Sequence, residues 1–213
     1  MKTKNILVTL AAAAMLATGP VLAKSPTIDT SDPGLMTVDG LYPVKHSRLD
    51  DAFAKPDFNL SQYAKVRIMQ PGIAYRRNSY ELSEKQAEKM VRYFNEALVA
   101  QLEKKGYELV DSVGPDVLLV DANIIDMKIN RPTERTTGRT TIFTASSGEM
   151  TLIGELRDSR SGELLARFAD RQQPRSYWAE STSVREWSDA RRAFNFWAKI
   201  LADRLDSFHE EDE

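Results

Sequence analysis

Residues 116–129 of the chain read DVLLVDANIIDMKI, and this stretch decides which fold the sequence favours. From Leu118 to Ile124 an apolar residue occupies every second position, which is typical of a β-strand with one buried face. Beyond Ile124 the apolar residues fall on positions of the opposite parity, namely Ile125, Met127 and Ile129. This change of parity predicts a bulge or a switch of face at Ile124–Ile125, within a long strand.

The segments before this strand have the patterns of a strand, a helix and a short strand. Residues 63–69 alternate between apolar and polar side chains and end before a Pro-Gly pair. A helix is predicted to begin at Ser83, because Gln86 follows three residues later as in a capping box. Two lysines and then Gly106 predict where this helix ends, and residues 107–110 have the pattern of a short strand.

The segments after the long strand complete the predicted fold. Residues 131–146 are rich in Thr, Arg and Gly and predict a long hairpin excursion. A return strand is expected over 148–156, followed by a turn at 158–162 and a further antiparallel strand through Phe168. A polar connector then leads to a last helix beginning near Ser183. Together these elements predict an α+β fold, a two-layer sandwich of a mainly antiparallel meandering sheet packed against two long helices.

The first 23 residues have the pattern of a cleavable secretion signal. Lys2 and Lys4 precede an apolar run over residues 6–16, and small residues stand at Val21 and Ala23, where signal peptidase requires them. The mature protein is therefore expected to begin at Lys24 and to be periplasmic or secreted. The alternative is an uncleaved signal that tethers the chain to the membrane.

The rest of the chain divides into three parts. Residues 24–56 carry scattered prolines and glycines without a sustained period and predict an extended N-terminal arm, with Leu41 and Tyr42 as packing anchors. Residues 57–208 are expected to form a single α+β domain, and residues 209–213 an acidic tail.

Charge and cysteine content exclude several classes of function. The formal charge is −2, and removal of residues 1–23 takes away two lysines and no acid, which leaves −4. Such a charge gives nucleic acid no overall attraction. The chain has no cysteine, which excludes disulfides, thiolate metal sites, cysteine nucleophiles and a thioether-linked lipid anchor.

Three blocks of the sequence resemble a known family. They are Gly114–Val120, the segment from Gly148 to Arg171 with its Asp158–Gly162 turn, and Ala193–Ala198. They are similar to domain-of-unknown-function family 3313, a group of bacterial envelope lipoproteins, over about residues 39–206. The resemblance implies an envelope location and a mixed α/β domain, and it brings no catalytic residues. Because this chain lacks the lipidated cysteine of that family, no lipid anchor is expected.

Few side chains offer acid–base or nucleophilic chemistry. The two histidines are His46 and His209, both in segments expected to be loosely held, and His46-Ser47 lacks the surroundings of a base and nucleophile. Asp121 interrupts the apolar run of the long strand. It is interpreted either as a buried acid paired with an arginine or a backbone amide, or as one of two carboxylates of an envelope glycan hydrolase. No cofactor or metal site is predicted.

Two polar segments are candidates for a binding surface. Arg131, Arg135 and Arg139 share one loop with five threonines, which is suited to phosphate, carboxylate or glycan groups, or else is an ordinary solvated loop. Arg175, Tyr177 and Trp178 lie together in the polar connector and could form a platform for a partner or a sugar.

The sequence therefore favours an exported, noncatalytic envelope module for binding or assembly, with an envelope protein or a cell-wall polymer as its partner. Self-association through an exposed strand such as residues 63–69 is a further possibility.

Overall fold

The computed structural model describes residues 26–57, 59–128, 133–137, 140–144, 149–173 and 188–210. Its elements in chain order are β1 (Thr27–Ile28), η1 (Pro33–Leu35), β2 (Tyr42–Lys45), β3 (Asp51–Ala54), β4 (Lys65–Ile68), β5 (Ile73–Tyr75), α1 (Glu84–Lys104), β6 (Glu108–Leu109), β7 (Val117–Met127), β8 (Thr133–Thr137), β9 (Thr140–Thr144), β10 (Met150–Asp158), β11 (Leu164–Gln172) and α2 (Ser188–Glu210). A mixed nine-stranded sheet and two helices make this an α+β fold, as the sequence predicts.

The two edges of the sheet are built differently. The strands follow the order β1-β2-β3-β11-β10-β7-β4-β6. Strand β5 also pairs with β7, further along β7 than the part that β4 contacts. Neighbours from β1 to β7 are antiparallel, whereas β4, β5 and β6 run parallel to their partners. The predicted antiparallel meander therefore describes only the part of the sheet from β1 to β7. On the other side α1 carries the chain from β5 back to β6, because parallel strands need such a crossover.

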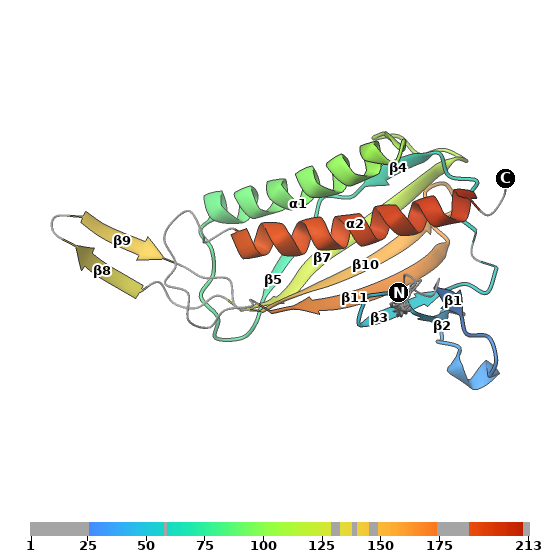
Figure 1. Cartoon of the computed structure of the whole chain (residues 1–213), viewed down its shortest axis with the longest axis horizontal. Helices are drawn as coiled ribbons and strands as arrows, with labels where there is room; N and C mark the ends of the chain where they lie inside the picture. The colour runs from blue at the N-terminus through green and yellow to red at the C-terminus, as the bar shows by residue number, and fades with distance from the viewer. Residues whose placement is uncertain are drawn as a thin grey trace, which may run out of the picture.

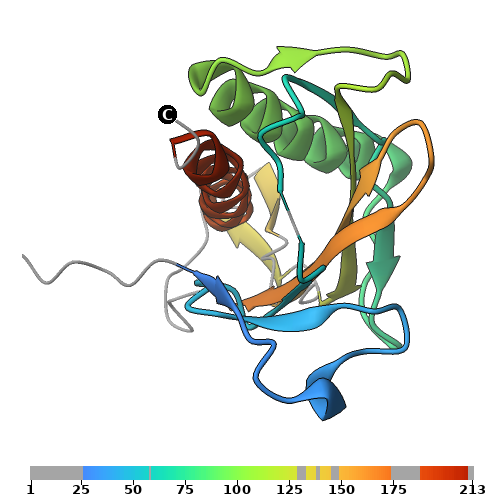
Figure 2. The ribbon, with the colours of Figure 1, turned by 90° about the vertical axis from the view of Figure 1, so that its right-hand side faces the viewer.

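Both helices lie side by side on one face of the sheet (Figures 1 and 2). Their contact is aromatic: the ring centroid of Phe94 in α1 lies 5.1 Å from that of Phe194 and 6.4 Å from that of Trp197 in α2. All three side chains are buried, together with the inward apolar residues of β7 and β10. The helices are therefore held to the sheet by one continuous apolar layer.

Helix α1 begins and ends as the sequence predicts. Ser83 is its N-cap residue, and its backbone N–H donates to Oε1 of Gln86 at 3.0 Å, the reach-back bond of a capping box. Gly106 follows the last turn with φ at 86°, a conformation that glycine adopts without steric cost. The chain can thus reverse directly into β6.

The bulge predicted in the long strand is confirmed. Ile73 and Tyr75 of β5, two residues apart, pair with Ile124 and Met127 of β7, three residues apart, so β7 carries one extra residue. Within this bulge the backbone of Asp126 adopts a left-handed conformation, with φ at 54°. Ile124 and Met127 are consequently both fully buried, although they differ in parity.

Residues 26–54, expected to lie in an extended arm, form the opposite edge of the sheet. Phe53 of β3 pairs with Arg167 of β11, and Pro43 of β2 pairs with Phe53 in turn. Leu41, predicted as a packing anchor, is fully buried. These strands are only two to four residues long and include a proline, so their sequence has no clear alternation.

The strand proposed for self-association is largely covered. Lys65 and Val66 of β4 pair with β6 on one side and with β7 on the other. Only Arg67 and Ile68 lack a partner on the β6 side in the part of the chain that the structure describes. Residues 63–69 are therefore not the open edge that the sequence suggested.

Candidate functional site

The face of the sheet opposite the helices carries a row of charged side chains. In β10 the residues Leu152, Gly154 and Leu156 point toward the helices, so Ile153, Glu155 and Arg157 point outward. The strand register places Glu155 between Asp121 of β7 and Arg167 of β11. The row therefore crosses three adjacent strands.

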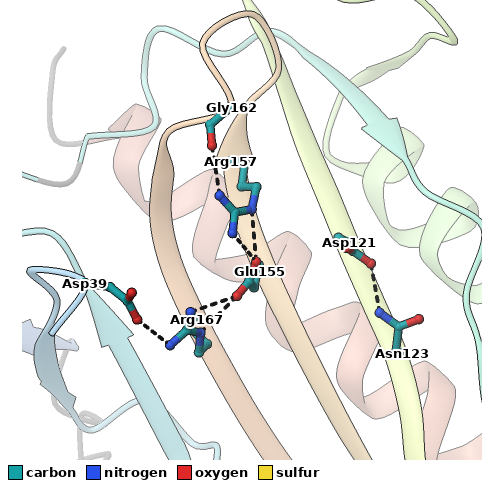
Figure 3. A network of polar contacts seen from close by, with 7 residues as sticks. All are labelled: Asp39, Asp121, Asn123, Glu155, Arg157, Gly162 and Arg167. Carbon is teal, nitrogen blue, oxygen red and sulfur yellow. Dashed lines mark hydrogen bonds and ion pairs between the residues drawn. The ribbon is translucent and has the colours of Figure 1, made fainter. Parts of the chain in front are cut away.

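Glu155 is the centre of a connected network of ion pairs (Figure 3). Its Oε2 accepts hydrogen bonds from Nε and Nη2 of Arg157, at 2.9 and 2.6 Å, and its Oε1 accepts one from Nε of Arg167 at 3.0 Å. Arg167 also donates to Oδ2 of Asp39 at 2.7 Å, and Arg157 donates to the carbonyl of Gly162 at 2.8 Å. The network joins the loop before β2, strands β10 and β11, and the turn between them.

The network keeps its central acid ionised. Burial acts to raise the pKa of Glu155, but the hydrogen bonds from Arg157 and Arg167 outweigh it and hold that pKa below its usual range. The hydrogen bonds from Arg167 to Asp39 and Glu155 raise the pKa of the guanidinium. The result is a fixed arrangement of charges on an otherwise open surface.

Asp121, the acid that the sequence singles out, lies on this same face. Its side chain is half-buried, and its Oδ1 accepts a hydrogen bond from Nδ2 of Asn123 at 2.8 Å. Oδ1 of Asn123 accepts in turn from the backbone N–H of Gly72 at 2.8 Å. Its position in β7 points away from the core, so Asp121 is not a fully buried acid, and within the described part of the chain no arginine or backbone amide is paired with it.

Asp121 and Glu155 are the two carboxylates that could serve the hydrolase suggested by the sequence. The two residues are cross-strand partners, and such partners have Cβ atoms about 4.5–5.5 Å apart. A glycosidase needs one of its two carboxyls protonated near neutral pH. The pKa of Glu155 is shifted in the opposite direction, so Glu155 is poorly suited to donate a proton.

A shallow hollow of about 500 Å³ lies over this row. Its lining includes Phe53, Asp121, Asn123, Ile153, Glu155 and Arg167. It thus combines an aromatic ring and an exposed apolar side chain with carboxylate, amide and guanidinium groups. Such a combination can contact a polar ligand or a partner surface through both packing and hydrogen bonds.

A different acid is buried in the core. Asp170 of β11 is only 4% exposed, and its Oδ2 accepts hydrogen bonds from the indole Nε1 of Trp197 at 2.6 Å and from Gln172 at 2.7 Å. Its Oδ1 accepts from the backbone N–H of Asp50 at 3.2 Å. These partners explain its burial, and they tie β11 to α2.

The candidate pair His46 and Ser47 has a structural role. His46 is exposed with φ at 61°, and Oγ of Ser47 donates to the carbonyl of Leu49 at 3.0 Å within a turn. Among the residues that the structure describes, no group of three or more His, Cys, Asp or Glu side chains could hold a metal ion. Within those same residues, no helix has the length and apolarity to cross a membrane.

The two binding surfaces predicted from the sequence stay predictions. Arg131, Arg139, Arg175, Tyr177 and Trp178 lie outside the described residues. Arg135 lies in β8, where its backbone pairs with Ile142 of β9, so the predicted hairpin is confirmed. Figure 1 shows that this hairpin extends away from the sheet and the helices.

The charged row was missed, although the sequence contained a signal for it. Glu155 lies in the strand predicted over 148–156, Arg157 directly follows that strand, and Arg167 lies in the next predicted strand. The turn at 158–162 joins the two strands, and a register shift between Leu156 and Arg157 then places Glu155 opposite Arg167. Counting back from the turn would instead pair Glu155 with Ala166, so the sequence shows the charged residues but not their register.

Comparison with known proteins gives a family match and several distant structures. A family model described as "Protein of unknown function (DUF3313)" matches residues 31–201. No curated protein matches the chain.

Among solved structures, a neuraminyllactose-binding hemagglutinin homolog from Helicobacter pylori is similar at 15% identity and a TM-score of 0.41, over 71% of this chain and 92% of that chain. A minor lipoprotein from Acinetobacter baumannii is similar at 11% identity and a TM-score of 0.38, over 68% and 94%. The PelC dodecamer from Paraburkholderia phytofirmans is similar at 13% identity and a TM-score of 0.37, over 68% and 90%.

Proposed function

Because the chain belongs to the DUF3313 family, we propose that it is an exported, noncatalytic module of the bacterial envelope that binds or assembles with another envelope component. The observation that carries this proposal is the open face of the sheet, which neither described helix covers and on which Glu155, Arg157, Arg167 and Asp39 hold charges in fixed positions. Preorganised charges on an open face favour one partner orientation over others.

The envelope location rests on the first 23 residues. Two lysines, an apolar run and small residues at Val21 and Ala23 form the pattern of a secretion signal. We expect cleavage after Ala23 and a mature protein that is periplasmic or secreted, without a lipid anchor.

A noncatalytic role is supported by the chemistry of the open face. Glu155 is neutralised by two arginines, and Asp121 is bonded to an amide. Neither the hollow nor the turn at Ser47 presents a nucleophile with an activating base among the described residues.

We propose the partner to be an envelope protein or a cell-wall polymer. The hollow over Phe53 and Ile153 offers apolar contacts within a charged rim, which is the usual anatomy of a binding surface. We propose the loop with Arg131, Arg135 and Arg139, and the connector with Arg175, Tyr177 and Trp178, as two further binding surfaces.

Site-specific photocrosslinking in intact cells tests the proposal. A photoreactive residue replaces Ile153, which is 37% exposed at the centre of the open face, or Arg92, which is exposed on α1. Capture of one defined envelope protein or of cell-wall material from position 153, but not from position 92, is the expected result.

Variants sharpen the experiment. Arg167→Ala should reduce capture from position 153 because it removes the link between Glu155 and Asp39. Arg135→Ala combined with Trp178→Ala tests the predicted loop and connector separately. If positions 153 and 92 yield the same products, the open face is not a binding surface and this proposal fails.

A further inference from the structure

An apolar cavity lies on the helix-covered face of the sheet, between α2 and the strands β10, β11 and β3. Its volume is about 310 Å³. Most of its lining is aliphatic or aromatic, including Leu60, Leu152, Leu156, Phe168, Trp197 and Ile200. Protein interiors rarely leave such a space empty, because the side chains around a void lose packing contacts. The cavity is therefore a candidate ligand site.

Small residues leave this space open. The two residues of β3 that line the cavity are Ala52 and Ala54. On β10, residue 154 is glycine, and a Cβ there would overlap the ring of Phe168, so the glycine lets that ring lie directly against the strand. A leucine at either alanine would fill part of the space that is now empty.

The cavity is closed on one side and open on another. The lining from β3, β10 and α2 is buried, since Ala54, Leu152 and Ile200 are at most 3% exposed. The lining from the first strand is different: Pro26, just before β1, is partly exposed, and Thr27 is exposed. A ligand can therefore enter beside β1 with one end first and keep its other end in water.

The polar groups in the lining are already bonded within the protein. Apart from Thr27 at the rim, three lining side chains carry such groups. The indole Nε1 of Trp197 donates to Asp170, and Oγ of Ser47 donates to a backbone carbonyl at 3.0 Å. Arg204, the charged residue in the lining, donates to two backbone carbonyls at 3.1 and 3.3 Å. These walls offer apolar contacts in place of hydrogen bonds, so the enclosed part of a ligand has to be apolar too.

We propose that this cavity binds one alkyl chain of a lipid, with the chain on the apolar walls and the polar head in water beside β1. Ligand pockets commonly enclose most of a ligand within apolar walls. A sugar, a nucleotide or a peptide would leave hydroxyl or amide groups without partners inside. A cavity of about 150 Å³ with similar walls accommodates benzene, and on that scale a chain of about ten carbons matches this space.

This inference does not depend on the proposed function, because the cavity and the charged row lie on opposite faces of the sheet. The Arg167→Ala variant removes part of the charged row and should leave binding of the alkyl chain unchanged. The two ideas can therefore fail independently.

Native mass spectrometry gives the first test. The protein is purified from cells that express the full-length gene, and any ligand that it retains is identified. A retained lipid or other molecule with an alkyl chain supports the proposal and is removed before titration. A retained molecule without an alkyl chain overturns it.

Calorimetric titration of the ligand-free protein with hexanol, decanol and 1,10-decanediol gives the second test. Decanol is expected to bind with 1:1 stoichiometry and at least tenfold tighter than hexanol, because it buries four more methylene groups. Decanediol should bind at least tenfold more weakly than decanol. Its second hydroxyl would have to enter the closed side of the cavity without a hydrogen-bond partner.

A pair of matched variants locates the binding site. Ala52→Leu places a larger side chain in the cavity and should weaken decanol at least tenfold, and the shorter hexanol less. Ala100→Leu makes the same substitution at an exposed position of α1 and should change neither affinity.

The proposal is overturned if the ligand-free protein does not bind decanol, or if decanol and decanediol bind equally. Equal binding of decanol by Ala52→Leu, with its fold confirmed by circular dichroism, would also overturn it. A stable dimer that excludes decanol would mean that a second copy covers the cavity, and the proposal would then be wrong. Should Ala52→Leu fail to fold, the ratio of the affinities for decanol and decanediol decides alone.

Discussion

The two faces of the hairpin β10–β11 differ in almost every physical respect, although their residues alternate along the same strands. On the inner face Gly154 lies under the ring of Phe168, beside the apolar cavity. One residue further, on the outer face, Glu155 and Arg167 form the centre of the charged row. A strand with a two-residue period can therefore place apolar packing and a preorganised polar surface back to back.

The difference teaches how stability and binding are divided in this molecule. Inner side chains are removed from water and contribute through burial and packing. Outer charges stay partly solvated, so each ion pair contributes little to stability. We expect substitutions on the inner face to change the free energy of unfolding strongly, and those on the outer face to change it weakly.

The largest effect is expected for Phe94→Ala. Phe94 is fully buried against Phe194 and Trp197, and removal of such a ring lowers the free energy of unfolding by about 3–5 kcal/mol. Ile153→Ala on the outer face is the control and should change it by about 0.5 kcal/mol. Urea titration followed by circular dichroism measures both. Similar losses for the two variants would remove the distinction between the faces.

The next effect concerns the buried acid. Asp170→Ala leaves the indole N–H of Trp197 without its acceptor, which should cost about 2–3 kcal/mol. Asp170→Asn keeps an acceptor oxygen and should cost less. Trp197→Phe, combined with Asp170→Ala, should restore part of the loss relative to the sum of the single variants. Strict additivity in this double-mutant cycle would show that the hydrogen bond does not stabilise the contact between β11 and α2.

A smaller effect is expected at Gly154. Gly154→Ala pushes the ring of Phe168 off the strand and should lower the free energy of unfolding by about 1–2 kcal/mol. In a Phe168→Ala background the same substitution should cost almost nothing, because the ring is gone. An equal cost in both backgrounds would mean that the contact with Phe168 is not what requires glycine.

The sequence predicts the parts of the fold whose residues repeat with a period. Strand β7 with its bulge, helix α1 with its cap, and the β10–β11 hairpin all follow from local alternation, capping residues and turn residues. The last helix was also expected, and the structure describes it from Ser188 onward.

The edges of the sheet could not be predicted in this way. Strand β3 pairs with β11 more than a hundred residues later, and strands of two to four residues carry too little pattern to show that pairing. The parallel neighbours of β7 depend on which segments meet in space, and periodicity within one strand carries no such information.

The candidate site residues divide along the same line. Asp121 stood out because it interrupts an apolar run, yet its partner Asn123 lies on the same strand and on the outer face. Glu155, Arg157 and Arg167 do not stand out in the sequence, because alternating charges are typical of a solvated face. The cavity beside Arg204 could not be foreseen, since it is formed by β3, β10, β11 and α2 together.

The smallest predicted effect concerns pH and tests the outer face directly. Because the two arginines hold the pKa of Glu155 below its usual value of 4.5, the unfolded chain binds this proton more readily than the folded protein does. The stabilisation from the ionised carboxylate is therefore complete above about pH 4.5 and is lost as the pH falls through the lowered pKa. At pH 7, Glu155→Gln should lower the free energy of unfolding by about 1 kcal/mol or less.

The difference between Glu155→Gln and the unaltered protein should vanish in acid, and urea titrations at a series of pH values from 7 to 3 measure it. Glu96→Gln is the matched control, since its ion pair with Arg92 on α1 spans 3.9 Å between exposed side chains and should contribute almost nothing at any pH. A difference for Glu155→Gln that stays constant down to pH 3 would mean that the charge of Glu155 does not stabilise the network. The arginines would then owe their positions to the strands alone, and the charged row would be a consequence of the fold without holding β10 and β11 together.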